Sequence, residues 1–210
     1  NGDQMFLASS IIGLLITYAA IFLLLYGVHL LHKRGLPATA TRSIIQIGVT
    51  NWWFMARIFL TSPICALIGP LSFVLITFLL YKYNLIRAIE HPEKRKNLGI
   101  IYFPAVTAVI TLAAYIDFIP MAAATTGILI LGWSDGLASL IGQHLPASRP
   151  GIRAFFRRTF STPAGNKTLG GTSALFFSAV AIVILVLRID TQMAWQHILL
   201  SAMLVAGTVT

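Results

Sequence analysis

Apolar residues occur in long runs along this chain, separated by short polar or basic segments. An α-helix needs about 20 such residues to cross the hydrocarbon core of a bilayer. The runs predict an all-α, polytopic integral membrane protein with about seven transmembrane helices, which form a single transmembrane domain over residues 1–210. The expected spans are residues 5–31, 43–60, 64–81, 98–116, 121–142, 169–187 and 193–210.

The first and last runs lie at the ends of the sequence. The first is too long for the core of a signal peptide and lacks a basic leader, so we expect a retained helix. The last run reaches Thr210 inside an apolar stretch, so this span can be cut short there.

Basic residues fall in every second segment between the runs. Positive charge collects in the cytoplasmic loops of membrane proteins, so the N-terminus is expected outside and these segments inside the cell. Arg57 and Arg188 break the alternation, and Arg188 can pair with Asp190. The alternating residues are Lys33, Arg34 and Arg42; Lys82, Arg87, Lys94, Arg95 and Lys96; and Arg149, Arg153, Arg157, Arg158 and Lys167.

Composition agrees with a membrane protein, because 57% of the residues are hydrophobic and only 10% are charged. A net charge of +9 would suggest a nucleic-acid partner in a soluble protein. Here the cytoplasmic loops account for the charge, and no basic stretch is interleaved with base-reading motifs, so no nucleic-acid partner is expected. The single cysteine, Cys65, excludes an intrachain disulfide and a cysteine metal cluster.

One acid lies inside an apolar run. Asp135 follows Leu-Ile-Leu-Gly-Trp-Ser and precedes Gly-Leu-Ala-Ser-Leu-Ile-Gly, in the cytoplasmic half of the fifth expected helix. An Asp at the middle of a span costs about 2.5–3.5 kcal/mol on insertion scales, so it indicates function. On a helix, Asp135 shares a face with Ala138, Ser139 and Gly142. The glycines of this run are equally explained by close helix packing.

A second group of polar residues leads into the sixth span. Residues 165–172 read Gly-Asn-Lys-Thr-Leu-Gly-Gly-Thr. A lysine, hydroxyls and glycines at a helix start form an anion site, since free amides, the helix dipole and an ammonium converge there. The alternative is a capped helix start with a lysine that reaches toward the membrane surface. With an acid on the same cytoplasmic side, phosphate and a divalent cation become the better interpretation.

These residues resemble the integral-membrane CTP-dependent lipid kinases, a family that includes phytol kinase and dolichol kinase and is related to phosphatidate cytidylyltransferases. The first family motif is Gly-Asp, two residues, Ala, three residues, Gly. Asp135, Ala138 and Gly142 match it, and Ser134 replaces its Gly.

The second family motif is Lys, Ser or Thr, two residues, Gly. Lys167, Thr168 and Gly171 match it, whereas Gly170 stands where the family usually has Glu. Residues 97–104 are also similar to the segment that opens the preceding span.

Near the amino end the family has Arg-Lys, two residues, His. This chain has Arg42, Ser43 and Gln46 there, so that only the Arg is retained. The resemblance covers residues 41–210. A further family motif, with Glu and an Asp-Asn pair, follows the last helix and would lie beyond Thr210.

The resemblance implies transfer of the terminal phosphoryl of CTP to the hydroxyl of a membrane isoprenoid alcohol of the phytol, polyprenol or dolichol type, with magnesium, at the cytoplasmic face. Asp135 and Lys167 are the expected catalytic residues. Asp135 anchors magnesium or takes the hydroxyl proton, and the sequence leaves both roles open. The expected nucleotide-binding residues are Arg42, Ser139, Lys167, Thr168, Gly170 and Gly171.

Two other classes of function remain as alternatives. A cytidylyltransferase acting on a phospholipid such as phosphatidate would use the same nucleotide and a similar acid, but would attack the other end of the triphosphate. A membrane transporter also tolerates an acid at membrane depth, although no internal repeat of the kind found in many transporters is visible.

Overall fold

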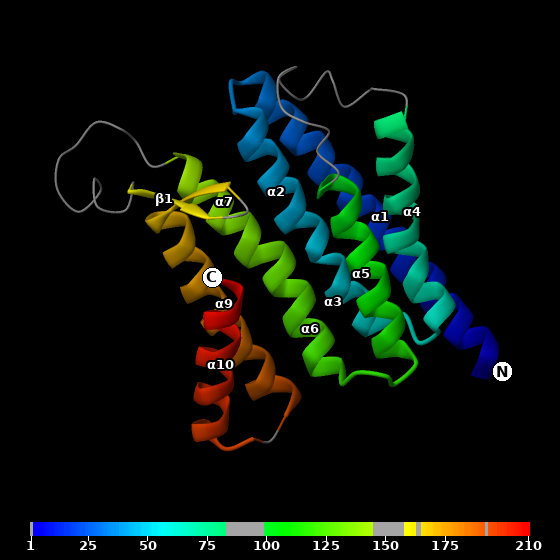
Figure 1. Cartoon of the computed structure of the whole chain (residues 1–210). Helices are drawn as coiled ribbons and strands as arrows, with labels where there is room; N and C mark the ends of the chain where they lie inside the picture. Colours follow the sequence, from blue (N-terminus) through cyan, green and yellow to red (C-terminus); the bar gives the residue numbers. More distant parts are fainter. Residues whose placement is uncertain (1, 83–98, 145–157, 163–164, 192) are drawn as a thin grey trace. The chain divides into compact units, whose positions relative to one another are not determined.

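The computed structural model describes residues 2–82, 99–144, 158–162, 165–191 and 193–210 (Figure 1). Within these ranges the chain is mostly α-helical, which confirms the expected helical class. The helices are α1 (Gly2–Lys33), α2 (Ala38–Thr50), α3 (Trp52–Phe59), α4 (Pro63–Lys82), α5 (Gly99–Tyr115), α6 (Met121–Leu129), the π-helical turn η2 (Ile130–Ser134), α7 (Asp135–His144), α9 (Leu169–Asp190) and α10 (Trp195–Val209).

A short antiparallel hairpin precedes α9 and was not expected from the sequence. Its strands are β1 (Thr159–Thr162) and β2 (Gly165–Thr168), and Phe160 pairs with Lys167 across it. The amide of Leu169 donates to the Arg158 carbonyl at 3.0 Å, so the backbone pairing continues to the first residue of the helix.

Three helical segments are long and apolar enough to cross a membrane, judged by length and composition. They are Ala8–Lys33, Met121–Gly142 and Leu169–Asp190, and each coincides with an expected span. Three shorter apolar helices overlap three other expected spans: Pro63–Leu79, Tyr102–Tyr115 and Trp195–Val209. The described residues therefore agree with a membrane protein. Three helices are long enough to cross a membrane, so the expected seven spans are not confirmed.

The expected span 43–60 is wrong as a single helix. α2 ends at Thr50 and α3 begins at Trp52, with Asn51 between them. The hydroxyl of Thr50 donates back to the Gln46 carbonyl at 2.6 Å, a local bond that weakens and bends helices. Pro63, whose missing N–H suits the first turn, then opens α4. Apolar residues resume directly after this break, at Trp52 and Trp53, so the hydrophobic run as a whole did not reveal it.

The chain forms two compact units, each discontinuous in sequence. Unit 1 comprises Asn1–Ala38 and Asn51–Ala124, and unit 2 comprises Thr39–Thr50 and Thr125–Thr210. Helix α6 passes from one unit to the other.

In unit 1, α3 lies at the centre of the packing. Trp53 and Ala56 are fully buried, and the Tyr115 hydroxyl at the end of α5 lies 2.9 Å from the Ala56 carbonyl and 3.0 Å from that of Leu60. The Ala56 carbonyl also accepts the Leu60 amide at 2.9 Å, and Leu60 is the C-cap residue of α3, so the Tyr115 hydroxyl binds at the end of this helix. Tyr115 therefore holds α5 against the end of α3.

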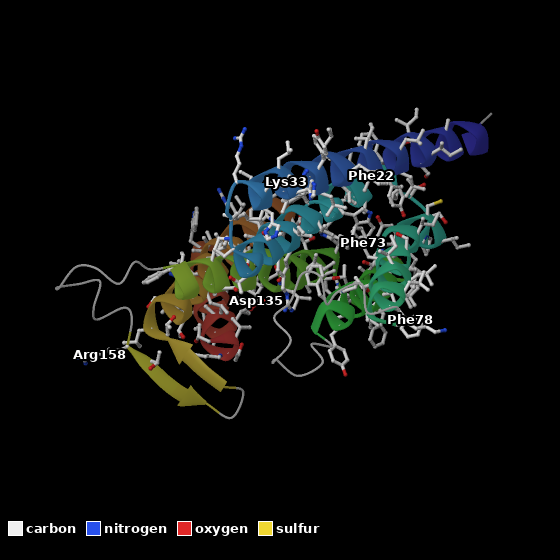
Figure 2. The ribbon with its side chains drawn as sticks, turned by 90° about the horizontal axis from the view of Figure 1, so that it is seen from above. Phe22, Lys33, Phe73, Phe78, Asp135 and Arg158 are labelled. Atoms are coloured by element: carbon white, nitrogen blue, oxygen red, sulfur yellow. The ribbon has the colours of Figure 1, made fainter. Side chains whose placement is uncertain are left out.

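Helix α1 packs on unit 1 by one side and presents the other outward. Gly13 lies against the Phe59 side chain, and the Tyr18 hydroxyl is 2.7 Å from that of Ser72 on α4. On the outward side, Leu15 and Phe22 remain 67% and 71% exposed. Figure 2 labels Phe22 on this helix. Apolar side chains exposed along a helix of this length suit contact with lipid chains.

In unit 2, α9 packs against both α7 and α10 (Figure 1). Val183 of α9 is buried, as are the small residues Ala202 and Ala206 of α10. Small side chains let helix backbones approach closely, which is the commonest device for joining helices in a membrane. At the turn between α9 and α10, the Arg188 guanidinium lies 4.9 Å from the centre of the Trp195 ring.

Candidate functional site

Asp135 begins α7, directly after the π-helical turn η2. Its backbone N–H donates to the carbonyls of Gly132 and Ile130, three and five residues back, instead of the fourth residue back that an α-helix uses. Single π-turns within α-helices occur frequently at functional sites. The backbone geometry thus distinguishes the position that the sequence singled out for its charge.

The Asp135 side chain, labelled in Figure 2, is exposed. The neighbouring Ser134 is fully buried. The lengthened turn changes the direction in which residues after it point, and a run of hydrophobic letters contains no information about that turn. An exposed carboxylate can accept ligands from outside the helix.

Gln46 of α2 contacts Asp135. Its Nε2 donates to Asp135 Oδ2 at 3.0 Å and to the Leu131 carbonyl at 2.8 Å. Sequence reasoning missed this residue as part of the site. The available signal was its place in the family motif, where Gln46 stands at the position of the His.

Two glycines that bracket Asp135 let α2 approach. Gly132 lies against the Thr50 side chain, and a Cβ on Gly136 would be 2.5 Å from Ile47 Cγ1. The packing role that the sequence offered for these glycines is confirmed. It also serves the site, because the close approach brings Gln46 within reach of the acid.

Helix α7 also packs directly on the first turn of α9. A Cβ on Gly142 would lie 2.9 Å from Thr168 Oγ1, and one on Gly171 would lie 3.0 Å from the Ala138 carbonyl. The small residues of both sequence motifs therefore meet at one helix contact. This contact fixes the helix of Asp135 to the segment of Lys167 within unit 2.

The first turn of α9 is capped by its own threonine. Thr168 is the N-cap residue, and its Oγ1 accepts the Gly171 amide at 3.1 Å, while Gly170 and Gly171 are buried. Because Leu169 already donates to Arg158, two of the first three amides of the helix are bonded within the chain. The capped start that the sequence offered as an alternative is present, and an anion here would depend mainly on side chains and on the Gly170 amide.

Lys167 is half-buried in β2, and its ammonium nitrogen donates to the Thr210 carbonyl at 3.4 Å. The contact ties Lys167 of β2 to α10 within unit 2.

Arg42 and Ser139 lie one helical turn from the Gln46 and Asp135 pair. Arg42 is exposed on α2, four residues before Gln46, and Ser139 is half-buried on α7, four residues after Asp135. Residues four apart share a helix face. The expectation that Arg42 belongs to a loop is wrong, because α2 begins at Ala38.

Several basic residues of the expected cytoplasmic segments lie outside the described residues, as do positions 97 and 98 of the segment that resembles the family. Their contribution to the site stays a prediction. These basic residues are Arg87, Lys94, Arg95, Lys96, Arg149, Arg153 and Arg157.

A divalent cation at this site would use one protein carboxylate. Within the described part of the chain, no group of three His, Cys, Asp or Glu side chains could hold a metal ion. Magnesium often binds through one or two carboxylates and completes its shell with phosphate oxygens and water. Asp135 fits that kind of site, because it is exposed and Gln46 donates to one of its two oxygens, Oδ2.

Comparisons of the chain with protein-family models, with curated proteins and with solved structures found no match. The resemblance to lipid kinases accordingly rests on the residues of the two motifs.

Proposed function

We propose that this protein is a membrane CTP-dependent kinase that phosphorylates the hydroxyl of an isoprenoid lipid alcohol at the cytoplasmic face. The observation that supports the proposal is the contact between α7 and the first turn of α9, through Gly142 and Thr168. It joins the segment of Asp135 to the segment of Lys167 in one compact unit. Phosphoryl transfer requires a metal anchor and a phosphate-binding cation, and the carboxylate of Asp135 and the ammonium of Lys167 are groups of these two kinds.

In this proposal Asp135 holds the cation and Lys167 binds the nucleotide phosphates. Magnesium, when bound, would neutralise charge on the phosphates. Lys167 exchanges its 3.4 Å contact with the Thr210 oxygen for a hydrogen bond to a charged phosphate oxygen. Thr168 and the Gly170 amide line the same helix start, while Arg42 and Ser139 extend the polar surface by one turn.

We further propose a multi-pass topology with seven crossings, in which α2 and α3 together make the second. The three basic segments face the cytoplasm, where the nucleotide is available. A lipid alcohol reaches the site laterally from the bilayer, with its hydroxyl at the level of Asp135.

The test uses purified protein, magnesium, CTP labelled at either the α or the γ phosphorus, and phytol, a polyprenol, dolichol, diacylglycerol and phosphatidate as acceptors. A kinase transfers the γ label to the alcohol and releases CDP. Transfer of the α label to phosphatidate with release of pyrophosphate would make the protein a cytidylyltransferase instead. No transfer to any acceptor would overturn the proposal and favour a transporter.

A further inference from the structure

We infer that Gln46 is the positioning residue of Asp135, holding both the carboxylate and the π-turn that presents it to a divalent cation. The inference deepens the proposed function and rests on it only for the identity of the bound cation. It is supported by the hydrogen bond from Gln46 Nε2 on α2 to the Leu131 carbonyl in η2, two residues that are 85 positions apart in sequence.

The π-turn creates the need for a donor. In a regular α-helix the Asp135 amide would donate to the Leu131 carbonyl. Here that amide donates to Gly132 and Ile130, so the Leu131 carbonyl lacks it. Gln46 Nε2 supplies a hydrogen bond to this carbonyl at 2.8 Å. The Gln46 side chain thus supplies the Leu131 carbonyl with a hydrogen-bond donor in place of the Asp135 amide.

The same nitrogen also holds the acid. A primary amide has two N–H donors, and Gln46 directs them to Leu131 O and to Asp135 Oδ2, at 2.8 and 3.0 Å. Both acceptors are oxygen atoms, so the amide nitrogen has to face them. Few side chains can replace it. An ionised Glu has no donor, and a neutral His has a single N–H.

Gln46 is itself held in place. Its main-chain carbonyl accepts the Thr50 hydroxyl at 2.6 Å. The neighbouring Ile47 and Thr50 lie against Gly136 and Gly132, on either side of Asp135. The two contacts fix the distance between α2 and the turn. The packing of α2 against the turn therefore sets the distance over which the Gln46 side chain has to extend to Asp135.

The neutrality of the amide matters for the site. A lysine or arginine at this position would form an ion pair with Asp135 and compete with a bound cation. Gln46 orients the carboxylate through Oδ2 and leaves its full negative charge. The Gln46 hydrogen bond reaches Oδ2, so we assign Oδ1 as the oxygen that binds a metal ion.

The first test measures whether the two side chains are energetically coupled. Thermal unfolding of the detergent-solubilised protein is compared for wild type, Gln46→Ala, Asp135→Ala and the double variant. We expect the decrease in Tm of the double variant to be smaller than the sum of the two single decreases by about 3 °C or more. Strictly additive decreases in Tm would contradict a direct interaction between the two side chains.

The second test measures cation binding without any nucleotide or lipid. Mn²⁺ alone is titrated into the protein and followed by electron paramagnetic resonance. We expect Gln46→Leu to raise the Kd about 10-fold, Gln46→His to fall between Gln46→Leu and wild type, and Asp135→Asn to abolish the site. Gln196→Leu, a glutamine exposed on α10 of the same unit, is the control and should not change the Kd.

The outcomes separate this inference from the proposed function. If the protein lacks kinase activity but shows the energetic coupling and a Gln46-dependent Mn²⁺ site, the positioning role of Gln46 is supported and the proposed kinase function is overturned. If the protein is an active kinase whose Mn²⁺ affinity is unchanged by Gln46→Leu, the positioning role is overturned and the proposed kinase function is retained.

Discussion

Gly142 of α7 lies against Thr168, the N-cap residue of α9, so closely that a Cβ on the glycine would be 2.9 Å from Thr168 Oγ1. The threonine cannot easily move away, because its Oγ1 accepts the Gly171 amide. The packing of α7 on α9 and the cap of α9 therefore depend on the same oxygen atom.

Gly142→Ala should lower the stability of the protein. The new methyl group displaces Thr168 and weakens its cap, which typically contributes about 1 kcal/mol. Gly207→Ala is the matched control, since a Cβ at this position of α10 meets nothing within 4 Å. Alanine is favoured over glycine in helices by about 0.8–1.0 kcal/mol, so the control should keep or raise Tm. Equal changes in Tm for both variants, measured by thermal unfolding in detergent, would contradict the close contact.

Asp135→Asn should preserve the fold and remove most activity. The asparagine oxygen can still accept the Gln46 hydrogen bond, so Tm should change little, but the charge that anchors a cation is lost. We expect CTP-dependent lipid phosphorylation to fall about 100-fold or more. Asp190→Asn, at the end of α9, should leave the rate unchanged. Near-normal turnover by purified Asp135→Asn would show that the site is assigned to the wrong residue.

Lys167→Ala should weaken nucleotide binding strongly. A hydrogen bond to a charged group contributes about 1.5–3 kcal/mol, which corresponds to a loss of CTP affinity of about 10- to 100-fold. Arg158→Ala, from the exposed start of the same hairpin, should act mildly and mainly at low salt, where screening is least. Direct CTP binding measured at two salt concentrations makes the comparison. Small and equal losses would indicate that Lys167 serves only to contact the Thr210 carbonyl.

The topology can be tested with single cysteines in a Cys65→Ala background. Lys94→Cys and Arg157→Cys should resist an impermeant thiol reagent in intact cells and react after lysis, because positive segments stay in the cytoplasm. Met193→Cys, exposed between α9 and α10, should react in intact cells. Reaction of the first two in sealed cells would invert the topology and remove the site from cytoplasmic CTP.

Hydrophobic patterning predicted part of this fold well. The runs 121–142 and 169–187 correspond closely to Met121–Gly142 and Leu169–Asp190, since burial in lipid demands length and apolar composition, and both are written in a linear sequence. The break at Asn51 and the hairpin before α9 were missed. The first involves the bond from the Thr50 hydroxyl to the Gln46 main-chain carbonyl, and the second the bond from the Leu169 amide to the Arg158 carbonyl. Neither bond alters the hydrophobicity of the sequence.

The candidate site shows the same division. The linear sequence is enough to recognise Asp135 as an isolated acid in an apolar run, and a lysine and glycines as the start of the helix capped by Thr168. The π-turn before Asp135, its hydrogen bond from Gln46 and the close approach at Gly142 and Gly171 are visible only in three dimensions. A charge or a small residue is a property of one position. A hydrogen bond between α2 and α7 instead requires two distant segments to approach to within 3.0 Å, which packing alone can achieve.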